Sequence, residues 1–127
     1  MRRTFKIPDL PQSVNSLYKI NYGHRVVYLS QEGRAFKFKV KLYMPALKFP
    51  KDSKFSISMQ FHSNWKYKNG NNKRADIQNL IKILIDAIFE KLGVDDSYVY
   101  HLEALKIQSK AHFTLVTLKD IADVVSA

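Results

Sequence analysis

The sequence predicts an α+β fold, in which one central amphipathic helix packs on a small mixed or antiparallel sheet. Between positions 77 and 92, apolar residues recur with the spacing i, i+3, i+4 and i+7, which is typical of a helix with one buried face. Between Phe55 and Phe61, apolar and polar residues alternate, which is typical of a strand with one buried face. Elements that are each apolar on one side are stable when they pack together. The 127 residues are enough for a single domain, 1–127.

The other predicted elements are short. Polar and turn-forming residues separate them, and their apolar residues alternate as in strands. They are a strand at Thr4–Ile7, a loose hairpin at 19–29 that turns at Tyr22-Gly23, a terminal hairpin made of 98–108 and 112–118, and one helical turn within 119–127.

The segment from Ser30 to Met44 supports two interpretations. Positions 36–42 alternate between apolar residues and lysines, which slightly favours a strand. Ser30 could instead cap a helix whose apolar stripe consists of Phe36, Val40, Tyr43 and Met44. In either case one face is rich in lysine, and it is either a solvated surface or a surface that contacts phosphates.

Net charge is the strongest compositional signal. Lys and Arg total 21 against 11 Asp and Glu, and the resulting charge of +10 predicts a polyanionic partner. The absence of cysteine excludes disulfides and thiolate chemistry, suits a cytosolic protein and, with only four scattered histidines, argues against a zinc site. No apolar run is long enough to span a membrane, and the N-terminus lacks a signal-peptide pattern.

The acidic residues gather around the predicted helix. Asp76 stands at its N-cap position and Gly93 just past its end, followed by Asp95 and Asp96. A helix over 77–92 is roughly 24 Å long, so the carboxylates at its two ends can meet only if the next strand runs back beside it. Five of the 11 carboxylates lie between positions 73 and 96, namely Asp76, Asp86, Glu90, Asp95 and Asp96.

Each of these residues also has an ordinary structural explanation. Asp76 can serve as a helix cap, and Lys82 with Asp86 can form an exposed i, i+4 ion pair. Asp95 and Asp96 can form a turn. Only their combination in one order points to a site that binds a metal ion and DNA.

That ordered combination resembles the RusA family of Holliday-junction resolvases, which are small DNA endonucleases of phages and bacteria. The family pattern is a basic run, Asp-x-Asp-Asn-Leu-x-Lys, a Leu/Phe-Asp-Ala helix, and then a Gly with an Asp-Asp pair. This chain has Lys73-Arg74, Asp76-Ile77-Gln78-Asn79-Leu80-Ile81-Lys82, Ile85-Asp86-Ala87 and Gly93-Val94-Asp95-Asp96. Upstream, 30–36 is similar to the family's Ser-x-Glu-Gly-x-Ala-Tyr and 11–15 to its Pro-x-Ser-x-Asn. The resemblance implies a helix over 34–44.

The resemblance also implies a metal site. The family holds a divalent cation with both carboxylates of Asp-x-Asp and one from the later pair. The equivalent residues here are Asp76, Gln78 and Asp96, with Asp95 a weaker candidate. Gln78 replaces the second carboxylate of the motif, so it offers a carbonyl oxygen without a charge. The fold and DNA binding survive this change in our interpretation, whereas full catalytic strength does not follow.

The reaction implied is phosphodiester hydrolysis assisted by Mg²⁺, with Mn²⁺ as an alternative. Asp76 and Asp96 would hold the cation, which polarises the scissile phosphate and lowers the pKa of an attacking water. Lys82 lies one helical turn past the motif and could stabilise the charge of the transition state. Asn79 and Asp86 match family positions and receive supporting roles.

DNA contacts are expected mainly in the loop from Ser63 to Arg74. Its aromatic residues alternate with cations, a pattern that suits stacking on an unpaired base or packing against a sugar. The candidate nucleic-acid-binding residues are Lys73, Arg74, Lys66, Lys68, Trp65, Tyr67 and, upstream, Asn15.

The resemblance further implies a homodimer that acts on branched DNA in the cytoplasm of a bacterium, associated with the nucleoid. Two cuts on opposing strands of a four-way junction require two active sites, which a two-fold dimer provides. The alternative is a DNA- or RNA-binding module of the same fold that lost catalysis at Gln78. A structural RNA-associated protein comes third, since it needs no clustered carboxylates.

Overall fold

The computed structural model describes residues 1–10, 18–123 and 125–126. Asn15 and the upstream motif at 11–15 lie outside the described residues. The elements in chain order are β1 (Arg2–Ile7), β2 (Tyr18–Asn21), β3 (Val26–Leu29), α1 (Gln31–Tyr43), β4 (Lys54–Ser63), α2 (Ile77–Leu92), the 3₁₀ turn η2 (Asp96–Tyr98), β5 (Val99–Gln108) and β6 (Phe113–Ile121).

The predicted α+β class is confirmed, and the main sheet is mixed. Its four strands have the order β1-β6-β4-β5. β6 runs antiparallel to both β1 and β4, whereas β5 runs parallel to β4. Parallel neighbours need a crossover connection, and α2 provides it between β4 and β5.

Two of the predicted C-terminal elements are wrong. β5 and β6 do not form a hairpin, because each pairs with a different side of β4. The helical turn predicted within 119–127 is also absent from the described residues there, since β6 continues to Ile121, which pairs with Lys54. Alternation of apolar residues reports which face of a strand is buried, but it does not report which strand lies next to it.

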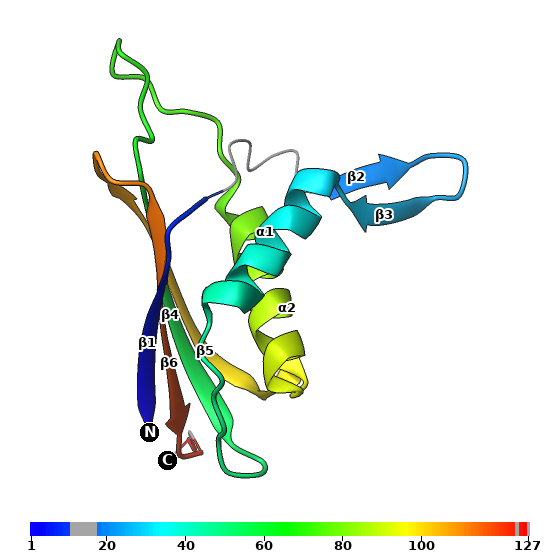
Figure 1. The fold of residues 1–127 in the computed structure, drawn as a ribbon, viewed down its shortest axis with the longest axis vertical. Coiled ribbons are helices and arrows are strands. Elements are labelled where there is room, and N and C mark those ends of the chain that lie inside the picture. Colours follow the sequence, from blue (N-terminus) through cyan, green and yellow to red (C-terminus); the bar gives the residue numbers. More distant parts are fainter. Residues whose placement is uncertain (11–17, 124, 127) are drawn as a thin grey trace.

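Both helices cover the same face of the sheet, and the opposite face carries no helix (Figure 1). The predicted inward face of β4 is confirmed, since Phe55, Ile57, Met59 and Phe61 are all buried. From α2, the core receives Leu80, Ile83, Leu84, Ala87, Ile88 and Phe89.

α1 confirms the helical interpretation of residues 34–44. The Ser30 side chain caps it by accepting a hydrogen bond from the backbone N–H of Gly33 at 3.1 Å. Phe36, Val40 and Met44 are buried, as a helical stripe requires, whereas Tyr43, the fourth member of the predicted stripe, is exposed. The strand-like alternation was misleading because it included Phe38, which lies on the solvent side with 69% of its surface exposed.

β2 and β3 form a separate two-stranded hairpin with the turn at the predicted place. In Figure 1 it projects away from the sheet beside the N-terminal end of α1. Ile20, Val27 and Tyr28 are exposed on it. Two strands are at best marginally stable alone, so this hairpin is suited to pack against another surface.

Candidate active site and nucleic-acid interface

The two ends of α2 set the positions of the candidate catalytic residues. The Asp76 side chain accepts a hydrogen bond from the backbone N–H of Gln78 at 3.0 Å, so the predicted N-cap is confirmed. Gly93 ends the helix in the left-handed region with φ 71°, and its N–H donates to the carbonyl of Phe89. Glycine tolerates this conformation because it has no Cβ.

Asp76 and Asp96 lie at opposite ends of this 16-residue helix. Such a helix is roughly 24 Å long. β5 does run back beside α2, but it begins at Val99, after Asp96. Among residues 1–10, 18–123 and 125–126, no three His, Cys, Asp or Glu side chains lie close enough to hold a metal ion. Within one chain, therefore, the predicted metal ligands are not brought together.

A cavity of about 340 Å³ lies at the C-terminal end of α2, and acidic side chains dominate its lining. Oxygen ligands of this kind suit hard cations such as Mg²⁺. Its lining residues are Asp86, Phe89, Glu90, Gly93, Val94, Asp95 and Asp96.

The pKa of Asp86 depends on burial and on the charges around this cavity. Burial raises the pKa of its carboxyl above the usual value, while the positive charges of Lys37 and Lys82 oppose that rise. The negative charges of Asp96 and Glu90 add to the increase in the Asp86 pKa. The charges of Lys82 and Asp96 thus both act on the Asp86 carboxyl.

Two carboxylates of the cavity already have partners. Glu90 accepts hydrogen bonds from Lys37 at 2.5 Å and Lys41 at 2.6 Å, and these bonds lower the pKa of its carboxyl. Asp95 accepts a bond from the backbone N–H of Ser97 at 2.8 Å, which lowers the Asp95 pKa and caps η2. The turn interpretation of Asp95 is therefore confirmed.

The loop after β4 forms an extended arm that projects beyond the sheet (Figure 1). The Trp65 indole N–H donates to the carbonyl of Phe61 at 3.0 Å, so Trp65 is anchored at the base of the arm. Lys106 lies 5.0 Å from the centre of the Trp65 ring and donates to the carbonyl of Ala75 at 2.6 Å. The base of the arm is thereby tied to the residue before Asp76.

The outer part of the arm carries exposed cations and an aromatic ring. An isolated β-bridge joins Lys66 to Asn72, and Gly70 turns the chain between them with φ 86°. Tyr67 is 56% exposed, and Lys73 lies 5.9 Å from the centre of its ring. Lys68 is also exposed. On the arm, Tyr67 is therefore more exposed than the anchored Trp65.

A family model described as endodeoxyribonuclease RusA matches residues 10–119. The chain belongs to the RusA family. A search of the curated proteins finds no match. RusA membership implies Holliday-junction resolvase activity, which is endonuclease action on branched DNA during recombination, and RusA-family nucleases generally use a divalent metal. No helix of the described residues is long and apolar enough to cross a membrane.

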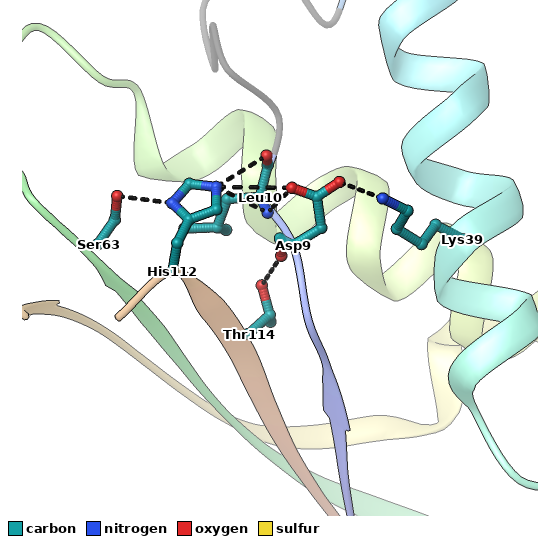
Figure 2. Close-up of polar contacts among 6 residues, drawn as sticks. All are labelled: Asp9, Leu10, Lys39, Ser63, His112 and Thr114. Atoms are coloured by element: carbon teal, nitrogen blue, oxygen red, sulfur yellow. Dashed lines mark hydrogen bonds and ion pairs between the residues drawn. The ribbon is translucent and has the colours of Figure 1, made fainter. Parts of the chain in front are cut away.

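One polar cluster of this RusA-family chain was not predicted. His112 bonds Ser63 Oγ through Nδ1 at 2.9 Å, and its Nε2 lies 3.5 Å from an Asp9 oxygen (Figure 2). Lys39 of α1 donates to the other oxygen of Asp9 at 2.5 Å, and Thr114 donates to the Asp9 carbonyl at 3.1 Å. These contacts join the end of β1 to the start of the arm. No sequence signal could reveal them, because the residues come from four distant segments.

The Asp86 environment leads to a test of stability. Because burial raises its pKa in the folded state, the stability linked to Asp86 is present below its ordinary pKa of 3.8 and is lost as the pH rises through the folded value. We therefore expect Asp86→Asn to raise the midpoint of thermal unfolding at pH 7 and to have little effect at pH 3.

Asp95→Asn is the matched control, with the opposite sign. Its pKa is lowered in the folded state, so its contribution is present at pH 7 and is lost as the pH falls through the folded value. This variant should unfold at a lower temperature than the wild type at pH 7. If Asp86→Asn also lowered the midpoint of thermal unfolding at pH 7, the favourable charges of Lys37 and Lys82 would outweigh the cost of burying the Asp86 carboxylate.

Proposed function

We propose that this protein is a divalent-metal-dependent resolvase of four-way DNA junctions that acts as a homodimer, with residues 1–127 as one domain. Mg²⁺ is the proposed cofactor, with Mn²⁺ as an alternative. The observation that carries the proposal is the RusA residue set placed along a single helix, with Asp76 at one end and an acidic cavity containing Asp96 at the other.

The separation of these carboxylates suggests how the dimer is built. A two-fold axis across α2 would place two such helices antiparallel, with Asp76 and Gln78 of each protomer beside the Asp96 of its partner. Each of the two resulting sites would then combine ligands from both chains. Antiparallel neighbours also bring opposite ends of the two helix dipoles together, which is favourable.

The surface of α2 supports this arrangement. Ile77, Ile81 and Ile85 recur every four residues, and each is only partly buried in the single chain. They form a stripe that leads from the Asp76 end of α2 toward Asp86. A second copy could cover this stripe without disturbing the core. Sedimentation should show a dimer at micromolar concentration that binds one junction, whereas a strict monomer would exclude the shared site.

Each group would have a defined chemical role. Oxygen atoms of Asp76, Gln78 and Asp96 fit a hard cation, which when bound polarises the scissile phosphate and acidifies a water. Lys82, one turn beyond Gln78, would place a positive charge where negative charge develops on the phosphate. Asp86 would orient Lys82, and Asn79 would support the first turn of the helix.

The direct test is nicking of a mobile four-way junction in Mg²⁺ or Mn²⁺, beside a linear duplex of the same sequence. Selective cutting of the junction is expected. The alternative function, a catalytically impaired binding module, is favoured specifically by Gln78, which removes one carboxylate from the motif. Tight junction binding without nicking at any metal concentration would establish that alternative.

Binding should depend strongly on salt. If the arm contacts phosphates, the logarithm of affinity should fall with the logarithm of salt by about 0.9 per phosphate neutralised. Replacing Lys73 and Arg74 together with alanine should weaken binding and flatten this slope. Replacing Arg2 and Lys119, a cross-strand pair far from the arm, is the matched control. If both double variants changed affinity and salt slope equally, the arm would not be the surface that contacts DNA.

A further inference from the structure

A second cavity, of about 330 Å³, lies between two connecting segments of the chain. One segment, 47–53, joins α1 to β4, and the other, 92–98, joins α2 to β5. This volume falls within the range of cavities that bind small ligands, roughly 300–1,000 Å³. Gly93, Val94 and Asp95 line both this cavity and the acidic one, so the two cavities share a wall.

The walls of the cavity are apolar and partly aromatic. Phe55 is buried and packs edge-on against Phe49, with ring centres 5.0 Å apart, and against Phe89 at 5.4 Å. The back of the cavity is therefore fixed by the core. Phe49 and Tyr98 also line the cavity, and both are only partly buried. Such surfaces accept a flat ring by stacking.

The rim of the cavity carries both signs of charge. Lys48 and Lys51 are exposed there and suit a phosphate group, whereas Asp52 and Asp95 can accept hydrogen bonds from an exocyclic amine. Asp52 has φ 61°, a conformation that is uncommon for a residue with a Cβ. Asp52 lies in a tight turn that the Ser53 N–H closes by donating to the carbonyl of Pro50 at 3.2 Å.

We propose that this cavity binds one unpaired nucleobase from the branch point of the junction, with its phosphate at Lys48 and Lys51. The inference rests on the proposed function, which brings branched DNA to the protein. A nucleotide needs an apolar slot for its base, a hydrogen-bond acceptor for its amine and cations for its phosphate, and the cavity supplies all three. Because the acidic cavity adjoins this one, the captured base would select which phosphate lies beside Asp96.

The test uses a junction that carries 2-aminopurine at the branch point. The fluorescence of this base rises when it leaves the stack of its neighbouring nucleobases. EDTA prevents cutting during the measurement. Wild-type protein should raise the fluorescence on binding. Leu47→Phe adds bulk that fills the cavity, so the base should lose its stacking contacts there. Because such stacking is worth about 1–3 kcal/mol, base capture should weaken by roughly fivefold or more. Leu42→Phe, at an exposed position of α1, is the matched control.

Three results would overturn the proposal. The first is junction binding without a rise in fluorescence, and the second is an equal effect of Leu47→Phe and Leu42→Phe. The third is conversion of the dimer to a monomer by Leu47→Phe, which would assign the cavity to a side chain of a second copy. If Leu47→Phe fails to fold, Lys51→Glu at the exposed rim should reduce the fluorescence rise instead, and no reduction would overturn the proposal.

The same junction separates this inference from the proposed function. Nicking is measured by adding Mg²⁺ or Mn²⁺ in place of EDTA. An absence of nicking together with a normal fluorescence rise would reject the resolvase activity and support the cavity. Normal nicking without a fluorescence rise would support the resolvase activity and reject base capture by the cavity.

Discussion

Neither Asp76→Asn nor Asp96→Asn should cut a four-way junction, yet an equimolar mixture of the two proteins should cut it. Each substitution removes a charge that holds the metal without adding bulk, so nicking by either variant alone should fall at least roughly 100-fold, equivalent to about 3 kcal/mol. In a mixed dimer with shared sites, one site carries both substitutions and the other carries neither. Random exchange of subunits would leave about one quarter of all sites intact.

The products and controls make this result specific. A mixed dimer has one competent site, so it should nick the junction and rarely make the paired cut. Glu103→Gln changes an exposed residue of β5 and serves as the control. Mixing this variant with the wild-type protein should leave the rate of nicking unchanged. An inactive mixture of two variants that exchange subunits would place each site within a single chain. If Asp76→Asn only lowers thermal stability and leaves nicking unchanged, then Asp76 is a helix cap and no more.

Gln78→Asp should increase the rate of nicking and lower the metal concentration that nicking requires. The substitution restores the carboxylate of the family motif on a side chain one methylene shorter, and it adds one negative charge beside the proposed cation. Gln78 is exposed in the first turn of α2, so a carboxylate there costs little desolvation and is favoured by the helix dipole. Junction binding without metal should stay equal or weaken, because the new charge repels phosphate.

A metal titration of nicking by both forms provides the comparison. A high metal concentration should partly restore nicking by the chain with Gln78, so that the nicking rates of the two forms approach each other. Gln31→Glu at an exposed position of α1 is the control, because it adds one negative charge elsewhere on the protein. If Gln78→Asp is no faster at any metal concentration, position 78 is not a ligand, and the assignment from the family fails there.

Local signals in the sequence were sufficient for α2. Its cap at Asp76, its period and its glycine end each depend on residues within a few positions, and all agree. α1 was harder, because Phe38 and Leu42 are apolar yet exposed, which produced a strand-like alternation on a helix. The possible cap at Ser30 and the helical spacing of Phe36 and Val40 favoured a helix, and the resemblance of 30–36 to the family segment decided for it.

Features that join distant segments were beyond local reasoning. The placement of β5 and β6 on either side of β4 depends on the crossover through α2, and alternation carries no information about it. The contacts of His112 with Asp9 and Ser63 have no local signal either. The candidate site was predicted as a set of residues, and the structure places these residues at the two ends of one helix, which holds them apart.

The position of β6 inside the sheet has a consequence for how the protein folds during synthesis. β1 is made first, but among the described strands it pairs with β6 alone, so Phe5 cannot pair until Val116 has been synthesised. Until then β1 and one side of β4 have unpaired backbone groups, which expose the growing chain to aggregation. Contacts between such distant residues also slow folding. A chain that stops before residue 113 could therefore form only the β4–β5 pair with α2, and β1 would have no partner strand in that sheet.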